Sequence, residues 1–288
     1  MSSPSKCHLS VLLAPKGSVA AIFRRGPSKW VQLIKWNTLK DTFEFGQWFN
    51  GTIYTERCSI SPDGSKLVYF CSKFNQRTLK DSEYTFAWTA VSKLPYFTAI
   101  ALWPSDGSTW YGGGVFVDDR SIYLHLAPEK TEAHPDHRPP GQLKVKVFQE
   151  QDYDFIQERM ASIGWYKSEG EPWYWQKDRP AGKYILRYQE KSEISEGDLW
   201  GELEFVVHYK EDLASNLEFF STSAGADAGK ETRSQNIACA YFTVRTASNR
   251  SSLAVKSDRW VEWDSKGHLI FSDGGKLLRA RVDRHGIQ

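Results

Sequence analysis

The sequence predicts an all-β fold. Short runs that alternate polar residues with β-branched or aromatic ones recur along most of the 288 residues, which is typical of strands with one buried face. Turn residues separate these runs. PKGSVAAIF begins at Pro15 and PDGSKLVYF begins at Pro62, and both place Pro and Gly between strand-like segments. Because Pro fixes one turn dihedral and Gly accepts the positive φ of the next, both stretches predict β-hairpins.

Three more stretches carry the same strand–turn–strand pattern. They are FVDDRSIYL (116–124), WYWQKDRPAGKYILRY (173–188) and VEWDSKGHLIF (261–271). Further strand candidates lie between the hairpins, at residues 30–36, 42–48, 84–91, 96–103, 143–148, 203–209, 237–245 and 277–282. One short helix is expected over residues 152–164, where an Asp cap precedes apolar residues at helical spacing.

Each hairpin is followed by about two more strands before the next hairpin begins. Repeated units of four antiparallel strands are typical of a β-propeller, in which each sheet covers the apolar face of its neighbour. The five hairpins predict five blades, with six as the alternative because the last interval has room for a degenerate hairpin. We expect a single domain over residues 1–288, since strands resume on both sides of two polar insertions, 127–142 and 221–236.

Two stretches resemble known propeller repeats. The hairpin from Ser61 to Phe70 (SPDGSKLVYF) is similar to the repeat hairpin of TolB-like and WD-repeat propellers, and the stretch from Trp263 to Val282 resembles a terminal blade. The resemblance covers roughly a third of the chain and implies the propeller fold. It carries over no functional residue, because no Gly-His or Trp-Asp pair recurs at WD-repeat spacing.

The amino-acid composition limits the kinds of partner that this protein is expected to bind. The 37 Lys and Arg residues against 35 Asp and Glu leave a net charge of +2 and no basic run, which argues against a nucleic-acid binder. No window approaches the roughly 18 apolar residues of a membrane span, and the apolar run near the N-terminus is too short for a secretory leader. We therefore expect a cytoplasmic protein that binds neither nucleic acid nor membrane.

The cysteine pattern is also typical of a cytoplasmic protein. There are four, without a Cys-x-x-Cys pair, and they are Cys7, Cys58, Cys71 and Cys239. Their spacing is typical of buried thiols in a reducing environment. Whether Cys58 and Cys71 face each other across a hairpin is left open by the sequence.

Candidate catalytic groups have structural explanations. The turn carboxylates are expected to cap turn amides, and they are Asp63, Asp118, Asp119, Asp178 and Asp264. The HPDH stretch at 134–137 offers metal ligands, but its prolines indicate a solvated loop, so neither a metal nor a cofactor is expected. The glycines at 112–114 precede a strand instead of a helix, which indicates close backbone packing and not a phosphate loop.

Tryptophan is abundant, with 12 residues. Those within strands would fill the space between blades, whereas a second group precedes the innermost strands and would surround one mouth of the central channel. This predicted rim consists of Arg57, Trp110, Tyr111, Trp173, Arg259 and Trp260. Aromatic faces beside arginine suit a protein anchor or a small carbohydrate-like ligand.

These observations predict a non-catalytic recognition or scaffold module that binds a protein, or a small carbohydrate-like ligand, at that mouth. Two alternatives remain open. One is a propeller glycoside hydrolase that uses two axial carboxylates. The other is a structural subunit of a larger assembly.

Overall fold

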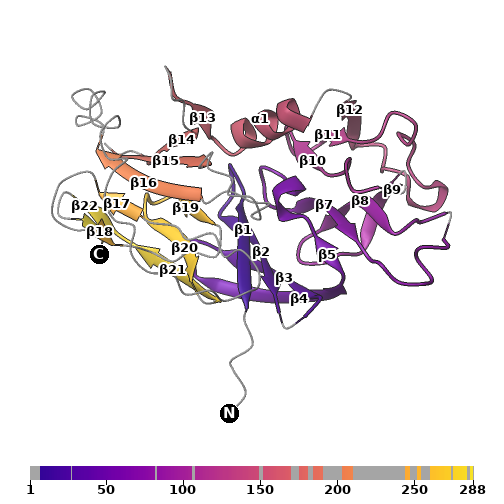
Figure 1. Cartoon of the computed structure of the whole chain (residues 1–288), viewed down its shortest axis with the longest axis horizontal. Coiled ribbons are helices and arrows are strands. Elements are labelled where there is room, and N and C mark those ends of the chain that lie inside the picture. Colours follow the sequence, from indigo (N-terminus) through magenta and orange to yellow (C-terminus); the bar gives the residue numbers. More distant parts are fainter. Residues whose placement is uncertain are drawn as a thin grey trace, which may run out of the picture. The chain divides into compact units, whose positions relative to one another are not determined.

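The computed structural model describes residues 7–26, 28–81, 83–105, 108–148, 152–169, 175–180, 184–190, 203–209, 244–246, 252–253, 260–273, 275–283 and 286–287. Within these ranges the chain is predominantly β-strand with one α-helix, which confirms the all-β prediction (Figure 1). The chain divides into two compact units, Met1–Gly164 and Trp165–Gln288. None of the helices in the described ranges is long and apolar enough to cross a membrane.

The first sheet of the first unit is a four-stranded antiparallel meander. Its strands, in spatial and chain order, are β1 (His8–Leu13), β2 (Val19–Arg25), β3 (Trp30–Asn37) and β4 (Thr42–Asn50). The predicted hairpin at Pro15 is confirmed, since the turn after β1 returns the chain into an antiparallel β2. Alternation along the strands places Leu12, Phe23 and Leu33 in one apolar cluster, and this face of the sheet is therefore buried.

The second sheet contains the second predicted hairpin. Its strands are β5 (Thr52–Ile53), β6 (Ser59–Ile60), β7 (Lys66–Ser72), β8 (Ala87–Lys93) and β9 (Ala99–Pro104), and the 3-10 helix η1 (Thr55–Arg57) lies between β5 and β6. Both β5 and β6 pair with β7. Gly64 in the β6–β7 turn has φ of +75°, a conformation that favours glycine. A Cβ at Gly64 would lie 2.5 Å from the Cβ of Val19, so this turn packs closely against β2.

The third sheet differs from the expected four antiparallel strands. It consists of β10 (Gly114–Phe116), β11 (Ser121–His125) and β12 (Lys144–Phe148). β10 and β11 form the third predicted hairpin, but β12 runs parallel to β11. A parallel neighbour requires a crossover connection. The 127–142 insertion, which contains the 3-10 helix η2 (Pro135–His137), supplies it.

The predicted helix is present as α1 (Asp152–Ser162). It contacts β10 (Figure 1). Phe155 of α1 is buried and stacks on His125 of β11, with 5.0 Å between ring centroids. The helix therefore closes the first unit on the side of the third sheet.

Two apolar clusters join the sheets of the first unit face to face. One connects the first and second sheets, and the other connects the second and third. β7 contributes to both, because successive side chains of a strand point to opposite faces. Leu67 and Tyr69 enter the first cluster, whereas Val68 enters the second.

The hairpins of the first unit also contact one another in chain order. The backbone N–H of Lys16 donates to the carbonyl of Pro62 at 3.0 Å, which links the first turn to the second. The N–H of Asp63 donates to Oδ1 of Asp119 at 2.8 Å, which links the second turn to the third. The turn of each of these hairpins is thus followed in space by the turn of the next.

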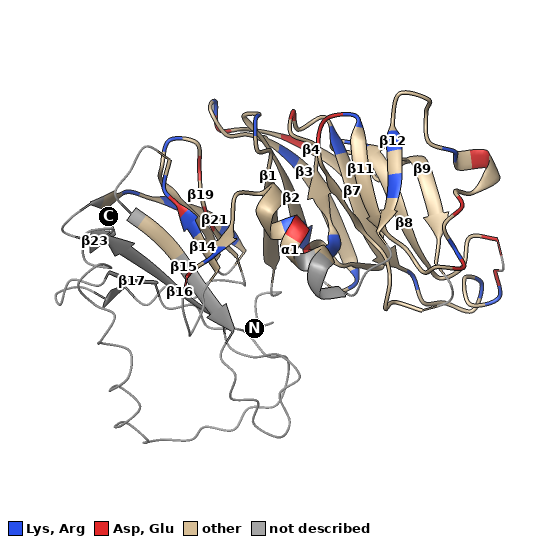
Figure 2. Ribbon diagram, turned by 90° about the horizontal axis from the view of Figure 1, so that it is seen from above, with Lys and Arg blue, Asp and Glu red and all other residues tan. Residues whose placement is uncertain are grey.

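Two outer strands of the first unit are protected against further pairing. β9 is covered by the insertion, because the N–H of His134 donates to the carbonyl of Leu102 at 2.8 Å. β12 carries the exposed Lys144 and Lys146, seen as blue bands in Figure 2. Edge lysines discourage the addition of another strand.

β4 is the exception among these edges. It displays Phe43, Phe45 and Trp48, which are 46%, 70% and 46% exposed. Contacts at Gln47 limit its outer edge, since the Gln47 N–H donates to the carbonyl of Pro95 at 3.1 Å and its Oε1 accepts from the N–H of Phe97 at 2.7 Å. The rest of the strand presents aromatic side chains, and its charged residue, Glu44, lies 3.7 Å from Lys35 of β3.

The second unit contains the last two predicted hairpins, β14–β15 and β19–β20. Its described strands form sheets of six, three and two strands. They are β13 (Tyr166–Lys167), β14 (Trp175–Asp178), β15 (Tyr184–Glu190), β16 (Leu203–Tyr209), β17 (Val244–Thr246), β18 (Ser252–Leu253), β19 (Val261–Trp263), β20 (Leu269–Asp273), β21 (Lys276–Ala280), β22 (Val282–Asp283) and β23 (Gly286–Ile287). The insertion at 221–236 and most of the strand predicted at 237–245 lie outside the described residues.

Candidate functional site

Three of the six residues of the predicted rim lie together in the first unit. Arg57 ends η1, and its Nη1 donates to the backbone carbonyl of Trp110 at 2.5 Å. Its guanidinium carbon lies 5.8 Å from the centroid of the Phe70 ring, within the range of a cation–π contact. The ring of Tyr111 lies 5.2 Å from that of His125, measured between centroids. We call this cluster of Arg57, Trp110 and Tyr111, with the pocket beside it, the Trp110 site.

Trp110 is exposed although its backbone is held in place. Its exposed fraction is 75%, the highest among the large apolar side chains of the described residues. The loop before it is internally bonded, since the Ser105 hydroxyl donates to the carbonyl of Ser108 at 2.6 Å and the Trp110 N–H donates to Ser108 Oγ at 3.3 Å. A large aromatic side chain presented from a held backbone is typical of an interface anchor.

The glycines after Tyr111 permit this close packing. Gly112 has φ of +132°, and a Cβ there would lie 2.2 Å from the ring of Phe70. Gly113 has φ of +94°, and its Cβ would lie 2.2 Å from the carbonyl oxygen of Arg57. Neither position accepts a side chain, so the structure confirms the prediction that these glycines allow close backbone approach.

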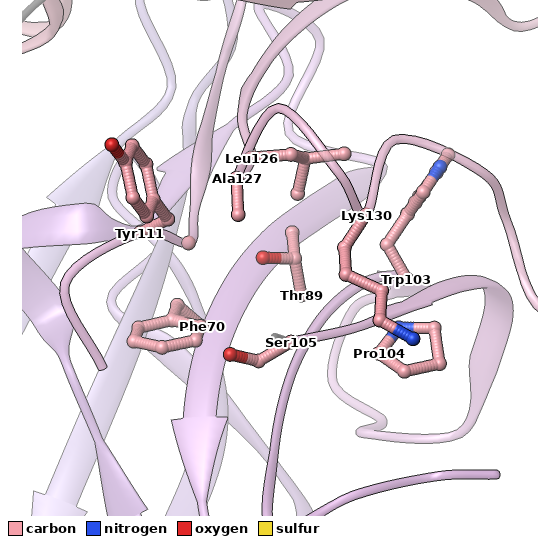
Figure 3. Close-up of a pocket in the computed structure, with 10 residues that line it drawn as sticks. Phe70, Thr89, Trp103, Pro104, Ser105, Tyr111, Leu126, Ala127 and Lys130 are labelled. Atoms are coloured by element: carbon pink, nitrogen blue, oxygen red, sulfur yellow. The ribbon is translucent and has the colours of Figure 1, made fainter. Parts of the chain in front are cut away.

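A shallow pocket lies beside Tyr111 (Figure 3). Phe70 and Tyr111 line one side, and Trp103, Pro104 and Lys130 line the other. Its interior has room for about one water molecule. Pockets that bind small molecules are much larger, about 300–1,000 Å³. This pocket is therefore a surface depression that could receive part of a side chain, and it is too small to enclose a sugar ring.

Helix α1 holds the element that carries Arg57. Arg159 of α1 donates through Nε to the carbonyl of Cys58 at 3.1 Å and through Nη2 to the carbonyl of Thr55 at 3.3 Å. Both acceptors belong to η1 or its C-cap. Hydrogen bonds thus connect α1 to η1 and η1 to Trp110, and the loop before Trp110 is bonded internally.

The other three residues of the predicted rim are not brought into this cluster by the described contacts. Trp260 belongs to the second unit, where it immediately precedes β19 and is half-buried. Trp173 and Arg259 lie outside the described residues. The full ring of six residues therefore stays a prediction.

The turn carboxylates accept hydrogen bonds from their own turns, as expected. Oδ1 of Asp63 accepts from the Ser61 hydroxyl at 2.6 Å and from the Ser65 N–H at 2.9 Å. Oδ1 of Asp118 accepts from the Arg120 N–H at 2.7 Å, and the pKa of Asp118 is lowered chiefly by this bond. A carboxyl group with a lowered pKa is poorly suited to be the general acid of a glycosidase, which needs a raised one.

Asp264 is engaged in the same way, whereas Asp119 and Asp178 accept from groups outside their own turns. In the second unit, Oδ1 of Asp264 accepts from the N–H groups of Lys266 and His268 at 2.9 and 2.8 Å. Its Oδ2 lies 3.0 Å from Nε of Arg279. Asp178 accepts from the hydroxyl of Tyr166 at 2.9 Å. The contacts therefore support turn capping for Asp63, Asp118 and Asp264.

A buried ion pair in the second unit had no signal in the sequence. Glu262 is 5% exposed, and its Oε1 lies 2.9 Å from Nζ of Lys177. Its Oε2 accepts from Nε1 of Trp165 at 3.0 Å, and Oε1 also accepts from the N–H of Trp263 at 2.8 Å. Both carboxylate oxygens thus have partners that link β14 to β19. We assign this pair to the stability of the second unit.

The HPDH stretch forms a second candidate cluster together with Glu83, which the sequence analysis missed because it lies 51 positions from His134. Single ligand-type atoms of Glu83, His134 and Asp136 lie within 4.8 Å of one another. However, the N–H of Asp136 donates to His134 Nδ1 at 3.2 Å, so the ring proton must sit on Nε2, which lies 3.0 Å from Glu83 Oε1. A metal-bound imidazole normally donates a hydrogen bond through its other nitrogen. This geometry fits a hydrogen-bonded imidazole and not a metal ligand.

The described cysteines are free thiols, and Cys58 and Cys71 are buried. Burial raises the pKa of Cys58 to about 12 and raises that of Cys71 well above its ordinary value. Cys58 Sγ donates to the carbonyl of Tyr54 at 3.1 Å. Neither thiol is therefore suited to act as a nucleophile. Cys239 lies outside the described residues.

Comparison with known proteins adds no relative. No family model, no curated protein and no solved structure matches this chain. The function must therefore be inferred from the geometry of the Trp110 site and the fold that carries it.

Proposed function

We propose that this protein is a non-catalytic recognition module that binds a protein partner through the Trp110 site. One observation carries the proposal. Trp110 is 75% exposed on a backbone that Arg57 holds, beside a pocket with room for about one water molecule. An aromatic anchor on a shallow surface suits a peptide or protein, whereas drug-sized small molecules are usually bound in larger, enclosing pockets.

The fold that we propose for this module is a five-bladed β-propeller. Successive hairpins contact one another in the first unit, through Lys16 with Pro62 and through Asp63 with Asp119. The same relation recurs within the second unit, where a Cβ at Gly267 would lie 2.8 Å from the side chain of Arg179. Repeated contact between neighbouring hairpins supports radial repetition, and five hairpins support five blades.

A rigid framework favours this role. Arg57, Trp110 and Tyr111 are held by hydrogen bonds or ring contacts before any partner arrives. Binding through such a surface loses little conformational entropy, so more of the contact energy appears as affinity. The turn carboxylates already accept hydrogen bonds from protein groups, which leaves binding as the chemistry that this surface supports best.

Selection from a displayed library of short random peptides on the intact chain tests the proposal. We expect selected peptides to contain an apolar anchor and to lose affinity about thirtyfold when Trp110→Ala removes a contact of about 2 kcal/mol. Arg57→Gln should weaken the same peptides less, because it loosens the Trp110 carbonyl but leaves the indole in place. Binding is measured by fluorescence anisotropy of labelled peptides.

Trp30→Ala is the matched control, because Trp30 is also an exposed tryptophan, at 45%, but lies on β3. It should leave affinity unchanged. Peptides that bind Trp110→Ala as tightly as the unaltered chain would contradict the proposal. Saturable binding of a free oligosaccharide on a glycan array, abolished by Trp110→Ala, would instead favour a carbohydrate-directed site.

A further inference from the structure

The 127–142 insertion is attached to the second sheet at His134. The backbone N–H of His134 donates to Leu102 of β9 at 2.8 Å. The imidazole is stacked on Tyr84, with 4.2 Å between ring centroids and 18° between ring planes. Only 1% of the His134 side chain is exposed. The insertion thus has a buried, titratable side chain at its point of attachment.

Both ring nitrogens of His134 are committed to one protonation state. Nδ1 accepts from the backbone N–H of Asp136, and this bond caps the η2 turn. A backbone N–H can only donate, so Nδ1 must be without a proton and Nε2 must carry it. Nε2 then donates to Glu83 Oε1 at 3.0 Å. The turn as it stands therefore requires a neutral imidazole.

Two carboxylates lie beside the ring of His134. The groups that face the ring are the carboxylates of Glu83 and Asp136, the hydroxyl of Tyr84 and the imidazole of His137, with the Asp81 carboxylate near Tyr84. β9 contributes a backbone carbonyl at this point. Partial desolvation, followed by the charges of Glu83, Asp136 and Asp81, raises the pKa of Tyr84.

We propose that protonation of His134 opens the η2 turn, so that the insertion covering β9 is a pH-sensitive element. A proton on Nδ1 would point at the N–H of Asp136, and two donors cannot share a hydrogen bond. The charged ring therefore loses the cap of η2. Imidazole side chains change charge between about pH 8 and pH 5, which sets the range of the effect.

Hydrogen exchange measured by mass spectrometry on the whole chain tests this proposal. Protection of the peptide covering residues 130–142 is compared at pH 8 and pH 5 after correction for intrinsic rates, with a chelator in every buffer. We expect protection to fall about tenfold at pH 5, the factor for loss of one hydrogen bond. Equal protection at the two pH values would overturn the proposal.

Three variants separate His134 from its surroundings. His134→Asn supplies a side-chain oxygen that caps η2 at every pH, so its protection should not change between pH 8 and pH 5. His137→Asn alters the other imidazole of the loop and should respond like the unaltered chain. Glu83→Gln removes a negative charge and should shift the midpoint to lower pH. A pH response that persists in His134→Asn, or disappears in His137→Asn, would overturn the assignment to His134.

Discussion

The backbone N–H of Asp63 donates to the carboxylate of Asp119 at 2.8 Å, which joins two hairpin turns that are 56 residues apart. Because a carboxylate is a strong acceptor, we expect Asp119→Ala to destabilise the first unit by about 1 kcal/mol. Chemical denaturation followed by tryptophan fluorescence measures this change. Asp119→Asn retains an acceptor oxygen and should cost less.

The exposed Glu129 supplies the control for this prediction. Glu129→Ala removes an exposed carboxylate from the 127–142 insertion and should leave stability within about 0.5 kcal/mol of the unaltered chain. If Asp119→Ala also left the free energy of unfolding unchanged, the contact between the hairpin turns would contribute nothing to the stability of the first unit.

Gly112→Ala should destabilise the chain by about 3 kcal/mol or more, because its φ of +132° is strained for alanine and its Cβ would meet the Phe70 ring at 2.2 Å. Gly141→Ala is the matched control, since a Cβ at that position would have nothing within 4 Å. Thermal melting of both variants measures the difference. Similar melting temperatures for the two would show that the chain does not need the close approach at Gly112.

The contribution of Asp63 to stability should depend on pH. Partial burial raises the pKa of Asp63. Hydrogen bonds from Ser61 and Ser65 and the charge of Lys66 lower it by a larger amount in total, so the pKa lies below its ordinary value. A lowered folded-state pKa gives stability that is complete above about pH 5 and is lost as pH falls through the folded pKa. Asp63→Asn caps the turn without titrating.

The free energies of unfolding of the unaltered chain and Asp63→Asn should therefore converge as pH falls from about 5 towards 2.5. Denaturation midpoints collected across this range measure the convergence. If the free energies of unfolding of the two proteins differed by the same amount at every pH, ionisation of the Asp63 carboxylate would not contribute to stability.

Cys58 should resist alkylation in the folded protein. With a pKa of about 12, only about one thiolate in ten thousand forms at pH 8, and the side chain is fully buried. Cys7 is partly exposed and should react first with iodoacetamide, as measured by peptide mass spectrometry. Addition of denaturant should remove this difference. Rapid labelling of Cys58 in the native chain would place the thiol at the surface.

Local patterns predicted local structure well. All five hairpins form where Pro, Gly and Asp interrupt alternating runs, and α1 occupies the predicted helix. The parallel pairing of β12 could not be predicted in this way, because alternation gives the face of each residue but not the direction of the neighbouring strand.

The candidate sites show the same limit. Trp110 and Tyr111 are adjacent in sequence, and their position before a strand placed them in the predicted rim together with Arg57. The structure adds the hydrogen bond between Arg57 and Trp110. Glu83 and His134, or Lys177 and Glu262, come together only through tertiary packing between distant segments. No local spacing encodes such pairs, so their partners could be found only in three dimensions.

The meander of β1 to β4 has a consequence for how the chain emerges from the ribosome. These strands pair only with their neighbours in sequence, so the sheet can be complete once residue 50 has been synthesised. Its apolar side, however, is covered by residues of β7 and β8 and by later residues as far as Leu102 of β9. During translation, this apolar face therefore stays exposed for a period on the order of seconds. A nascent-chain chaperone can bind the exposed face in that time.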